Sequence, residues 1–297
     1  MRKIILSALA LAAFTFVACN NDDDTITPPA TTANLTVAID GLENLGADFK
    51  YEGWIIVNGA PVSTGVFTVD DSGKLSETSF TVNATQLAAA SKFVLSVEPS
   101  NDTDPAPANT KILAGDFSSN SASISSTGIV ADFKSATGKY ILATPTDGAD
   151  NNERSGVWFL DVSGGSPATG LILPKLSAGW KYEGWVVIDG KPVSTGTFTD
   201  AAMADDNAAT STFKGDMGNG PAYPGEDFIK NAPTGLTFPT DLRGKTVVVS
   251  VEPDPDNSMA PFTLKPLAHT VPADANDHVT LTMGNGPVAE IKGTVTR

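Results

Sequence analysis

Two glutamates stand where a carboxyl group could act as an acid or a base. Glu98 and Glu252 close the segments FVLSVEP and VVVSVEP, each at the predicted end of a buried strand. Burial raises the pKa of a carboxyl group toward the range that catalysis uses. The simpler interpretation, which we favour, is that each carboxylate accepts hydrogen bonds from backbone N–H groups at the strand end. Glu52 and Glu183, each between two aromatic residues, invite the same two interpretations.

Catalytic motifs are missing from the rest of the sequence. Carboxylates on two domains could hydrolyse a glycosidic bond, but no local spacing places a pair at a useful separation. The sequence contains no glycine-rich phosphate loop, no nucleophile elbow and no Ser-His-Asp order. We therefore predict that the protein is not an enzyme and uses no cofactor, with a hydrolase built on Glu98 or Glu252 as an alternative.

The two histidines are poor candidates for a metal site. His269 and His278 lie nine residues apart on or near predicted strands, and no cysteine is close to them in the sequence. Zinc sites draw on several nitrogen and sulfur ligands. We predict two surface histidines and no metal at them.

Two acidic loops carry the oxygen atoms that Ca²⁺ prefers. One contains Asp147, Asp150 and Glu153, and the other contains Asp254 and Asp256. Neither loop has the spacing of a known calcium-binding loop. We interpret both as solvated turns, with a calcium site as the alternative.

Aromatic side chains provide the remaining candidate surface. The four tryptophans lie on or beside predicted strands, where such side chains usually belong to the core. If they were exposed, they could form a platform for a glycan or a peptide. The residues of this possible ligand surface are Trp158, Trp180, Tyr223 and Phe228.

Composition limits the partners and the fold. The chain has 297 residues, a formal net charge of −15 and a single cysteine. Such a surface repels phosphate backbones, so a nucleic-acid partner is not expected. The 27 glycines and 20 prolines, with many Thr, Ser and Val residues, favour strands and turns over long helices.

The amino terminus reads as an export signal. Residues 1–18 have a charged start and a short apolar run, and they end just before Cys19. This pattern resembles a bacterial lipoprotein signal, which implies cleavage before Cys19 and acylation of that residue. The acidic run Asp22-Asp23-Asp24 resembles the surface-export signal of lipoproteins in the Bacteroidetes group. We expect an outer-membrane lipoprotein exposed at the cell surface, with the periplasmic face as the alternative, on a Pro/Thr-rich tether that ends at residue 33.

The body of the chain contains a long stretch that occurs twice. Thirteen of twenty positions are identical between FKYEGWIIVNGAPVSTGVFT at 49–68 and WKYEGWVVIDGKPVSTGTFT at 180–199. The SVEP segments follow each copy, and VADFK at 130–134 and VAEIK at 288–292 come later. Shared blocks in one order indicate an internal duplication. The alternating apolar pattern predicts an all-β fold of two tandem β-sandwich domains, residues 34–136 and 137–297.

The two copies differ in their loops. The second copy has 23 more residues between its hairpin and its SVEP segment, and it begins with an added segment. Long loops in compact domains are often functional. We therefore expect any binding surface at Thr146–Arg154 and Gly215–Pro239 rather than in the shared hairpin.

The repeated blocks resemble the extracytoplasmic C-terminal domain of anti-sigma-K factors. The residues that carry the resemblance in the first copy are Tyr51, Trp54, Gly59, Pro61-Val62-Ser63, Gly65, Phe67 and Val97-Glu98-Pro99. Their counterparts in the second copy are Tyr182, Trp185, Gly190, Pro192-Val193-Ser194, Gly196, Phe198 and Val251-Glu252-Pro253. The resemblance implies a β-rich fold and a role outside the cytoplasm.

The chain departs from such anti-sigma factors in one respect. The helical sigma-binding region and the membrane helix of these factors have no counterpart in this sequence. We accordingly predict a binding or structural protein with a protein or glycan ligand. A regulatory or sensor role in anti-sigma-factor signalling is the alternative.

Overall fold

The computed structural model describes residues 31–148, 151–255 and 258–297. The predicted signal peptide, Cys19, the acidic run at 22–24, Asp150 and Asp256 lie outside these residues. The regular structure of the described chain is almost all β-strand, with one short α-helix, so the predicted all-β class is confirmed. In the described part of the chain, no helix has the length and apolar character needed to cross a membrane.

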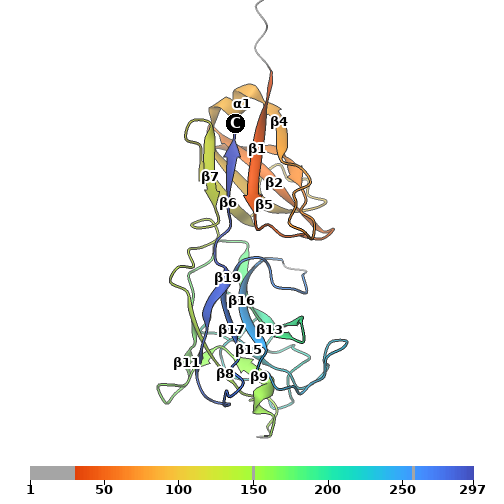
Figure 1. The fold of residues 1–297 in the computed structure, drawn as a ribbon, viewed down its shortest axis with the longest axis vertical. Coiled ribbons are helices and arrows are strands. Elements are labelled where there is room, and N and C mark those ends of the chain that lie inside the picture. The colour runs from red at the N-terminus through yellow and green to blue at the C-terminus, as the bar shows by residue number, and fades with distance from the viewer. Residues whose placement is uncertain (1–30, 149–150, 256–257) are drawn as a thin grey trace, which may run out of the picture. The chain divides into compact units, whose positions relative to one another are not determined.

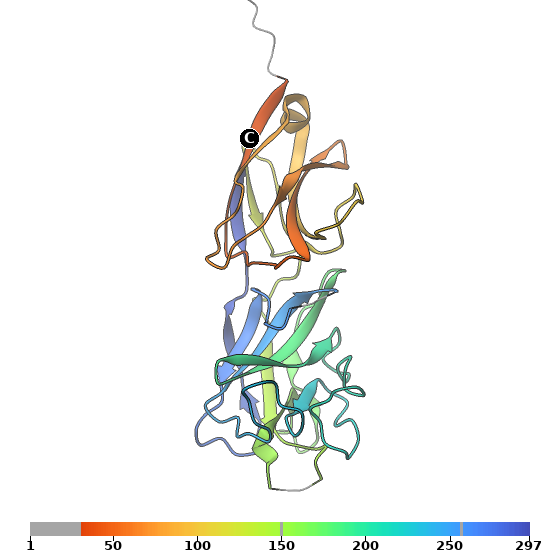
Figure 2. The same cartoon turned by 90° about the vertical axis from the view of Figure 1, so that its right-hand side faces the viewer.

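The first module is one antiparallel sheet of eight strands with the helix α1 (Figures 1 and 2). The strand order is β3-β2-β5-β6-β7-β20-β1-β4. The bounds are β1 Thr32–Asp40, β2 Phe49–Val57, β3 Ala60–Phe67, β4 Ser79–Asn83, α1 Ala84–Ala89, β5 Ala90–Pro99, β6 Lys111–Asp116, β7 Ser121–Ser125 and β20 Lys292–Thr296. Asn83 caps α1 by accepting the N–H of Gln86 at 3.0 Å, and Leu87 is buried.

The second module has two main sheets. One has the order β14-β13-β16-β17-β19, and the other has the order β12-β8-β9-β15 with β18 also paired to β8. The bounds are β8 Thr137–Leu142, β9 Gly156–Trp158, β10 Leu160–Asp161, β11 Ala168–Thr169, β12 Leu171–Ile172, β13 Trp180–Ile188, β14 Lys191–Phe198, β15 Gly225–Asp227, β16 Thr246–Pro253, β17 Lys265–Thr270, β18 Leu281–Thr282 and β19 Gly284–Val288. The 3-10 turn η1 covers Glu153–Ser155, and β10 pairs only with β11.

The repeated stretch forms the same hairpin in both modules. Its turns have positive φ at both central residues, 51° and 82° at Asn58-Gly59 and 50° and 80° at Asp189-Gly190. This is the type I′ geometry that the Asn-Gly and Asp-Gly pairs predict. The pairing register slips after Gly53 in one hairpin and after Gly184 in the other, so the bulge recurs as well.

The shared tyrosines make matching contacts. Tyr51 donates its hydroxyl to the carbonyl of Glu43 at 3.1 Å, and Tyr182 donates to the carbonyl of Pro174 at 2.6 Å. In both cases the acceptor lies eight residues earlier, in the loop before the hairpin. Each tyrosine ring also stacks on a phenylalanine of the returning strand, in the pairs Tyr51–Phe67 at 5.4 Å and Tyr182–Phe198 at 5.6 Å.

A buried polar relay links the hairpin of the first module to the loop after β5. The indole N–H of Trp54 donates to Ser96 Oγ at 2.8 Å, and the Ser96 hydroxyl donates to the Glu98 carboxylate. That carboxylate also accepts the backbone N–H of Ala108 at 2.8 Å, and Lys111 Nζ donates to the carbonyl of Ala108 at 2.8 Å. Both polar groups of one loop residue are thereby satisfied, which fixes the path of the loop.

The second module contains the same relay. Trp185 donates to Ser250 Oγ at 2.8 Å, and Ser250 donates to the Glu252 carboxylate. Glu252 accepts the N–H of Phe262 at 2.9 Å, and Lys265 Nζ donates to the Phe262 carbonyl at 2.6 Å. The spacing from serine to glutamate to loop residue to lysine is the same in both modules. The favoured prediction, that Glu98 and Glu252 bond to backbone N–H groups, is confirmed.

The third shared block does not form a strand in the first module. Residues 130–134 form turns and irregular chain between β7 and β8. The end of the chain also departs from the expected division of the chain at residue 137. Strand β20 belongs to the second predicted domain by sequence, but it pairs with β1 and β7 in the first module.

Loss of either relay carboxylate is expected to destabilise the module that contains it. Glu98→Gln or Glu252→Gln weakens two charge-assisted hydrogen bonds inside the protein, at a cost of about 1–3 kcal/mol each. Urea denaturation of residues 31–297 measures the effect, and the exposed Asp274→Asn serves as the matched control. Equal midpoints for Glu252→Gln and Asp274→Asn would contradict the structural role.

Candidate binding cleft

The described surface of the second module contains a cleft of about 550 Å³. Segments 151–155 and 239–241 supply most of its lining, and Asp277 and His278 complete it. The first segment belongs largely to the addition at Thr146–Arg154, and the second begins at the last residue of Gly215–Pro239. Of the two segments in which the sequence predicted a binding surface, Thr146–Arg154 supplies four lining residues, whereas Gly215–Pro239 supplies only Pro239.

Hydrogen bonds of Ser155 tie these segments together. Its hydroxyl donates to the carbonyl of Phe228 at 2.7 Å and accepts the N–H of Thr240 at 2.7 Å. The N–H of Leu242 donates to the carbonyl of Arg154 at 3.0 Å. Because Ser155 is only 2% exposed, these bonds are shielded from water and hold the walls of the cleft in place.

The long insert is anchored behind the cleft by Asp227. Its buried carboxylate accepts the N–H of Thr146 at 2.7 Å and the indole N–H of Trp158 at 2.7 Å. The insert then crosses the Trp158 ring at Gly220, where φ is +78° and a Cβ atom would lie 2.1 Å from that ring. The glycines of the insert permit this close approach, since no larger residue fits at Gly220.

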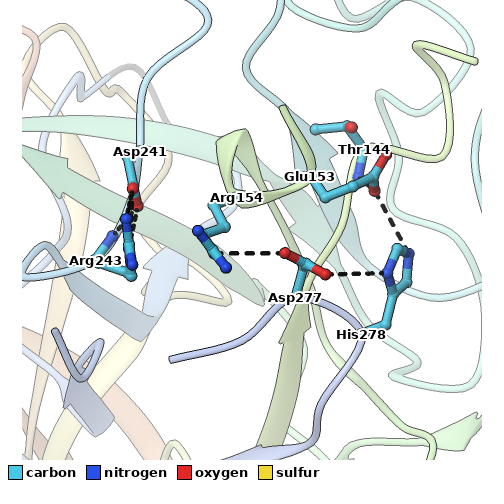
Figure 3. A network of polar contacts seen from close by, with 7 residues as sticks. All are labelled: Thr144, Glu153, Arg154, Asp241, Arg243, Asp277 and His278. Atoms are coloured by element: carbon cyan, nitrogen blue, oxygen red, sulfur yellow. Dashed lines mark hydrogen bonds and ion pairs between the residues drawn. The ribbon is translucent and has the colours of Figure 1, made fainter. Parts of the chain in front are cut away.

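Charged side chains of alternating sign form a row at the cleft (Figure 3). Every member of the row lines the cleft except Arg243, which pairs with the lining residue Asp241. Arg243 donates through Nε to both carboxylate oxygens of Asp241, at 2.9 and 3.1 Å. The hydrogen bonds from Arg243 hold the pKa of Asp241 below its usual value. Next along the row, Arg154 Nε lies 3.4 Å from the Asp277 carboxylate.

His278 ends this row between two carboxylates. Its Nδ1 lies 3.7 Å from Asp277 and its Nε2 lies 3.4 Å from Glu153, and its side chain is 59% exposed. The backbone of His278 has φ +53°, a left-handed conformation that is uncommon for residues other than glycine. The N–H of His278 donates to the carbonyl of Leu142 at 2.9 Å, and Glu153 accepts the N–H of Thr144 at 2.9 Å. Backbone bonds thus fix both members of the His278–Glu153 pair.

This arrangement suits a polar ligand rather than a strongly charged one. The two arginines donate only and the three carboxylates accept only, and they alternate along the row. Groups such as hydroxyls and amides, which donate and accept at once, match that alternation. A polyanion would meet three carboxylates, and a polycation would meet Arg154. Across residues 31–148, 151–255 and 258–297, no group of three or more His, Cys, Asp and Glu side chains is placed to hold a metal ion.

The predicted aromatic ligand surface is wrong. Trp158, Trp180 and Phe228 are 2%, 3% and 0% exposed, and Tyr223 is half-buried. Trp158 packs beneath the insert at Gly220, and Phe228 lies within the insert and packs against Phe213. Tyr223 donates to the carbonyl of Pro167 at 3.2 Å, and the Trp180 ring lies 5.7 Å from the Phe262 ring. The sequence could not indicate that the insert covers Trp158.

The other candidate residues have structural partners. Asp147 accepts from Asn152, Glu153 accepts from Thr144, and Asp254 lies 3.7 Å from Lys181 Nζ, while Asp150 and Asp256 lie outside the described residues. His269 is half-buried and lies 2.9 Å from the Tyr140 hydroxyl, so only His278 is the predicted surface histidine. Glu52 and Glu183 accept from Ser63 and Ser194, the serines of the shared PVS segment.

The two SVEP glutamates are closed to substrate. Glu98 and Glu252 are 1% and 0% exposed. Burial raises the pKa of Glu98, but its carboxylate faces Ser96 and the Ala108 N–H inside the relay. A hydrolase built on these two residues is therefore rejected. The residues shared by the two copies therefore have structural roles within each module.

Residues 8–112 match the family model of the anti-sigma-K factor rskA, C-terminal. This confirms the resemblance that the repeated residues of the first copy predicted. Over these residues the chain is therefore similar to a domain of anti-sigma factors. The matched segment ends in β6, so it includes the first hairpin and the first SVEP segment but none of the cleft residues. The comparisons with curated proteins and with solved structures found no match.

Sequence reasoning located the cleft but missed most of its charged residues. It named Glu153 only as a calcium candidate and His278 only as a surface histidine, and it did not single out Arg154, Asp241 or Asp277. These residues come from three separate segments, and only the fold brings them together. The Arg and Asp residues that cluster near the ends of both added segments could have indicated this charged row.

A cluster of buried carboxyl groups lies under the insert. Asp205 and Glu226 are 6% and 3% exposed. Burial raises the pKa of Asp205 to about 6 and that of Glu226 to about 7. The Gly225 N–H donates to Asp205 at 3.0 Å, and Ser211 donates to Glu226, which partly offsets the burial. Burial also raises the pKa of Asp227.

These pKa values predict that the second module loses stability as pH rises. The folded chain keeps protons on Asp205 and Glu226 that the unfolded chain has already released at pH 5. Their stabilising contribution is complete below the unfolded pKa and is lost as pH passes through 6 and 7, at about 2–3 kcal/mol each. Denaturation midpoints measured from pH 5 to 8 are expected to fall. Glu226→Gln should flatten the decline, whereas the exposed Asp216→Asn should not. A midpoint that rises over this range would contradict the prediction.

Proposed function

We propose that this chain is a non-catalytic, lipid-anchored binding protein outside the cell, whose ligand occupies the cleft between segments 151–155 and 239–241. One observation carries the proposal. Residues shared by the two copies are engaged in bonds that hold each module together, whereas the cleft is lined by residues outside the shared blocks, including the addition at Thr146–Arg154. The alternating donors and acceptors there favour a polar protein or glycan group as ligand.

The ligand interaction is expected to depend on the central ion pair of the cleft. We expect the Arg154→Gln, Asp277→Asn double variant to capture about tenfold less ligand, since it loses charge-assisted hydrogen bonds worth at least 1.4 kcal/mol. Immobilised residues 31–297 are exposed to solubilised cell envelope, and bound protein and carbohydrate are quantified. The control removes the exposed ion pair Lys92–Asp116 by Lys92→Gln, Asp116→Asn. Equal capture by both double variants would reject the cleft as the site.

The lipid anchor and the surface position rest on the sequence of residues 1–24. Cys19→Ser removes the residue that would be acylated, so the protein should lose fatty-acid label and leave the detergent phase. A variant that still takes up the label would contradict the anchor. Replacing Asp22, Asp23 and Asp24 by Ala should protect the protein from protease added to intact cells. Unchanged cleavage would show that this run does not direct surface exposure.

The family match favours a second candidate function. The matched family is the C-terminal domain of an anti-sigma-K factor, so the chain could serve as an extracytoplasmic component of anti-sigma-factor signalling. In that role, ligand at the cleft would change transcription that depends on a sigma factor. Deletion of the chain should then alter the transcriptome under envelope stress, and the cleft double variant should reproduce the change. An unchanged transcriptome would contradict this second function and would leave the binding role as the remaining proposal.

A further inference from the structure

Strand β20 lies between β1 and β7 in the sheet of the first module and pairs with both of them. We call this position between β1 and β7 the slot. It pairs antiparallel with β1 from Asp40↔Lys292 to Thr36↔Thr296, and with β7 from Ser125↔Lys292 to Ser121↔Thr296. Figure 1 shows this last strand, in blue, between β1 and β7. The whole second module lies in the chain between β7 and β20. Two neighbouring strands of one sheet are thus separated by more than 160 residues of sequence.

Strand β8 fills the corresponding slot in the second module. It pairs antiparallel with β12 at Leu171↔Gly138, with β18 at Leu281↔Tyr140 and, through its last residues, with β9 at Ile141↔Trp158. Strand β12 precedes the shared hairpin of its module as β1 does, and β18 and β19 come before the VAEIK block as β7 comes before the VADFK block. The two slots are therefore equivalent, yet each is filled by a strand that the other repeat would supply.

The position of the third shared block shows why each module is completed by a strand from the other repeat. VADFK at 130–134 comes just before β8, and VAEIK at 288–292 leads into β20. The strand that follows the first repeat completes the second module, and the strand that follows the second repeat completes the first. This is reciprocal strand exchange between two copies within one chain, the same exchange that joins two chains in domain swapping.

The slot requires few specific side chains from the strand that fills it. In β20 only Val295 is buried, and its neighbours Thr294 and Thr296 are exposed. Main-chain pairing with β1 and β7 therefore supplies most of the contact, as it does when an extended peptide is added to a sheet. The strands that fill the two slots, TGKYIL and KGTVT, share little beyond small and β-branched residues.

Arg297 closes the slot after β20. Its Nη1 donates to the carbonyls of Leu87 and Ala90 at 2.8 and 2.6 Å, and its Nη2 donates to Ser119 at 2.8 Å. The guanidinium carbon also lies 4.4 Å from the centre of the Phe117 ring. These contacts come from one side chain at the end of the strand, so a single substitution can loosen the strand without changing the slot.

We propose that the slot between β1 and β7 is a strand-binding surface whose partner in trans is a second copy of this chain, which inserts its own β20. The contacts made in trans are those already made in cis, so the exchanged dimer differs from the monomer mainly in effective concentration. The second module and its cleft are unchanged by the exchange, so the inference does not depend on the proposed ligand.

Split cysteines test the exchange. Residues 31–297 form one compact unit and contain no native cysteine. Ala38 and Thr294 are paired and exposed, so Ala38→Cys is placed on one chain and Thr294→Cys on a second chain of different mass. The two chains are unfolded, mixed, refolded together at high concentration and then oxidised. A disulfide forms between them only when β20 of the second chain lies beside β1 of the first.

The matched control uses a pair in the same sheet that exchange leaves within one chain. Asn34 and Thr81 are paired between β1 and β4 and are also exposed, so Asn34→Cys and Thr81→Cys are split in the same way. We expect about tenfold more linked heterodimer for the Ala38/Thr294 pair than for this control. In native buffer, Arg297→Ala should speed the linkage about tenfold, and Arg297→Lys should speed it less. Heterodimer at the control level after joint refolding would overturn the proposal.

Discussion

The buried carboxylate at the end of each SVEP segment is the constraint on which both modules depend. A glutamate cannot remain ionised in an interior without compensating donors, because the loss of hydration costs several kcal/mol. Glu98 and Glu252 obtain those donors from a serine two residues earlier and from a backbone N–H ten residues later. The serine is oriented in turn by the hairpin tryptophan. One carboxylate thus joins the hairpin, the adjoining strand and the following loop.

This constraint separates residues that build the fold from residues that could meet a ligand. The tyrosine, tryptophan, serine and glutamate positions of the repeat all have the same partners twice, at the same spacing, although the loops around them differ. These residues are also buried, so they are not available to a ligand. The cleft lies in the second copy, and its charged row is assembled from segments 153–154, 241–243 and 277–278. The family match agrees with this division, since it contains the fold residues of the first copy and ends before the cleft.

Much of the fold could be predicted from the sequence because the signals were local. Asn58-Gly59 and Asp189-Gly190 set their turns through backbone preference alone, and the alternating apolar residues set the strands. The placement of β20 could not be predicted, because a five-residue strand with one buried side chain carries no mark of its partner. The burial of Trp158, which we predicted to be part of a ligand surface, could not be predicted either. Only the course of the glycine-rich insert decides that its ring is covered.

Hydrogen–deuterium exchange on residues 31–297, with and without solubilised cell envelope, tests the central claim most directly. The claim is that the repeated residues hold the fold and the added segments of the second copy take the ligand. The account predicts new protection at 151–155, 239–241 and 277–278, with no change in the hairpins at 49–68 and 180–199. New protection confined to those hairpins would contradict it.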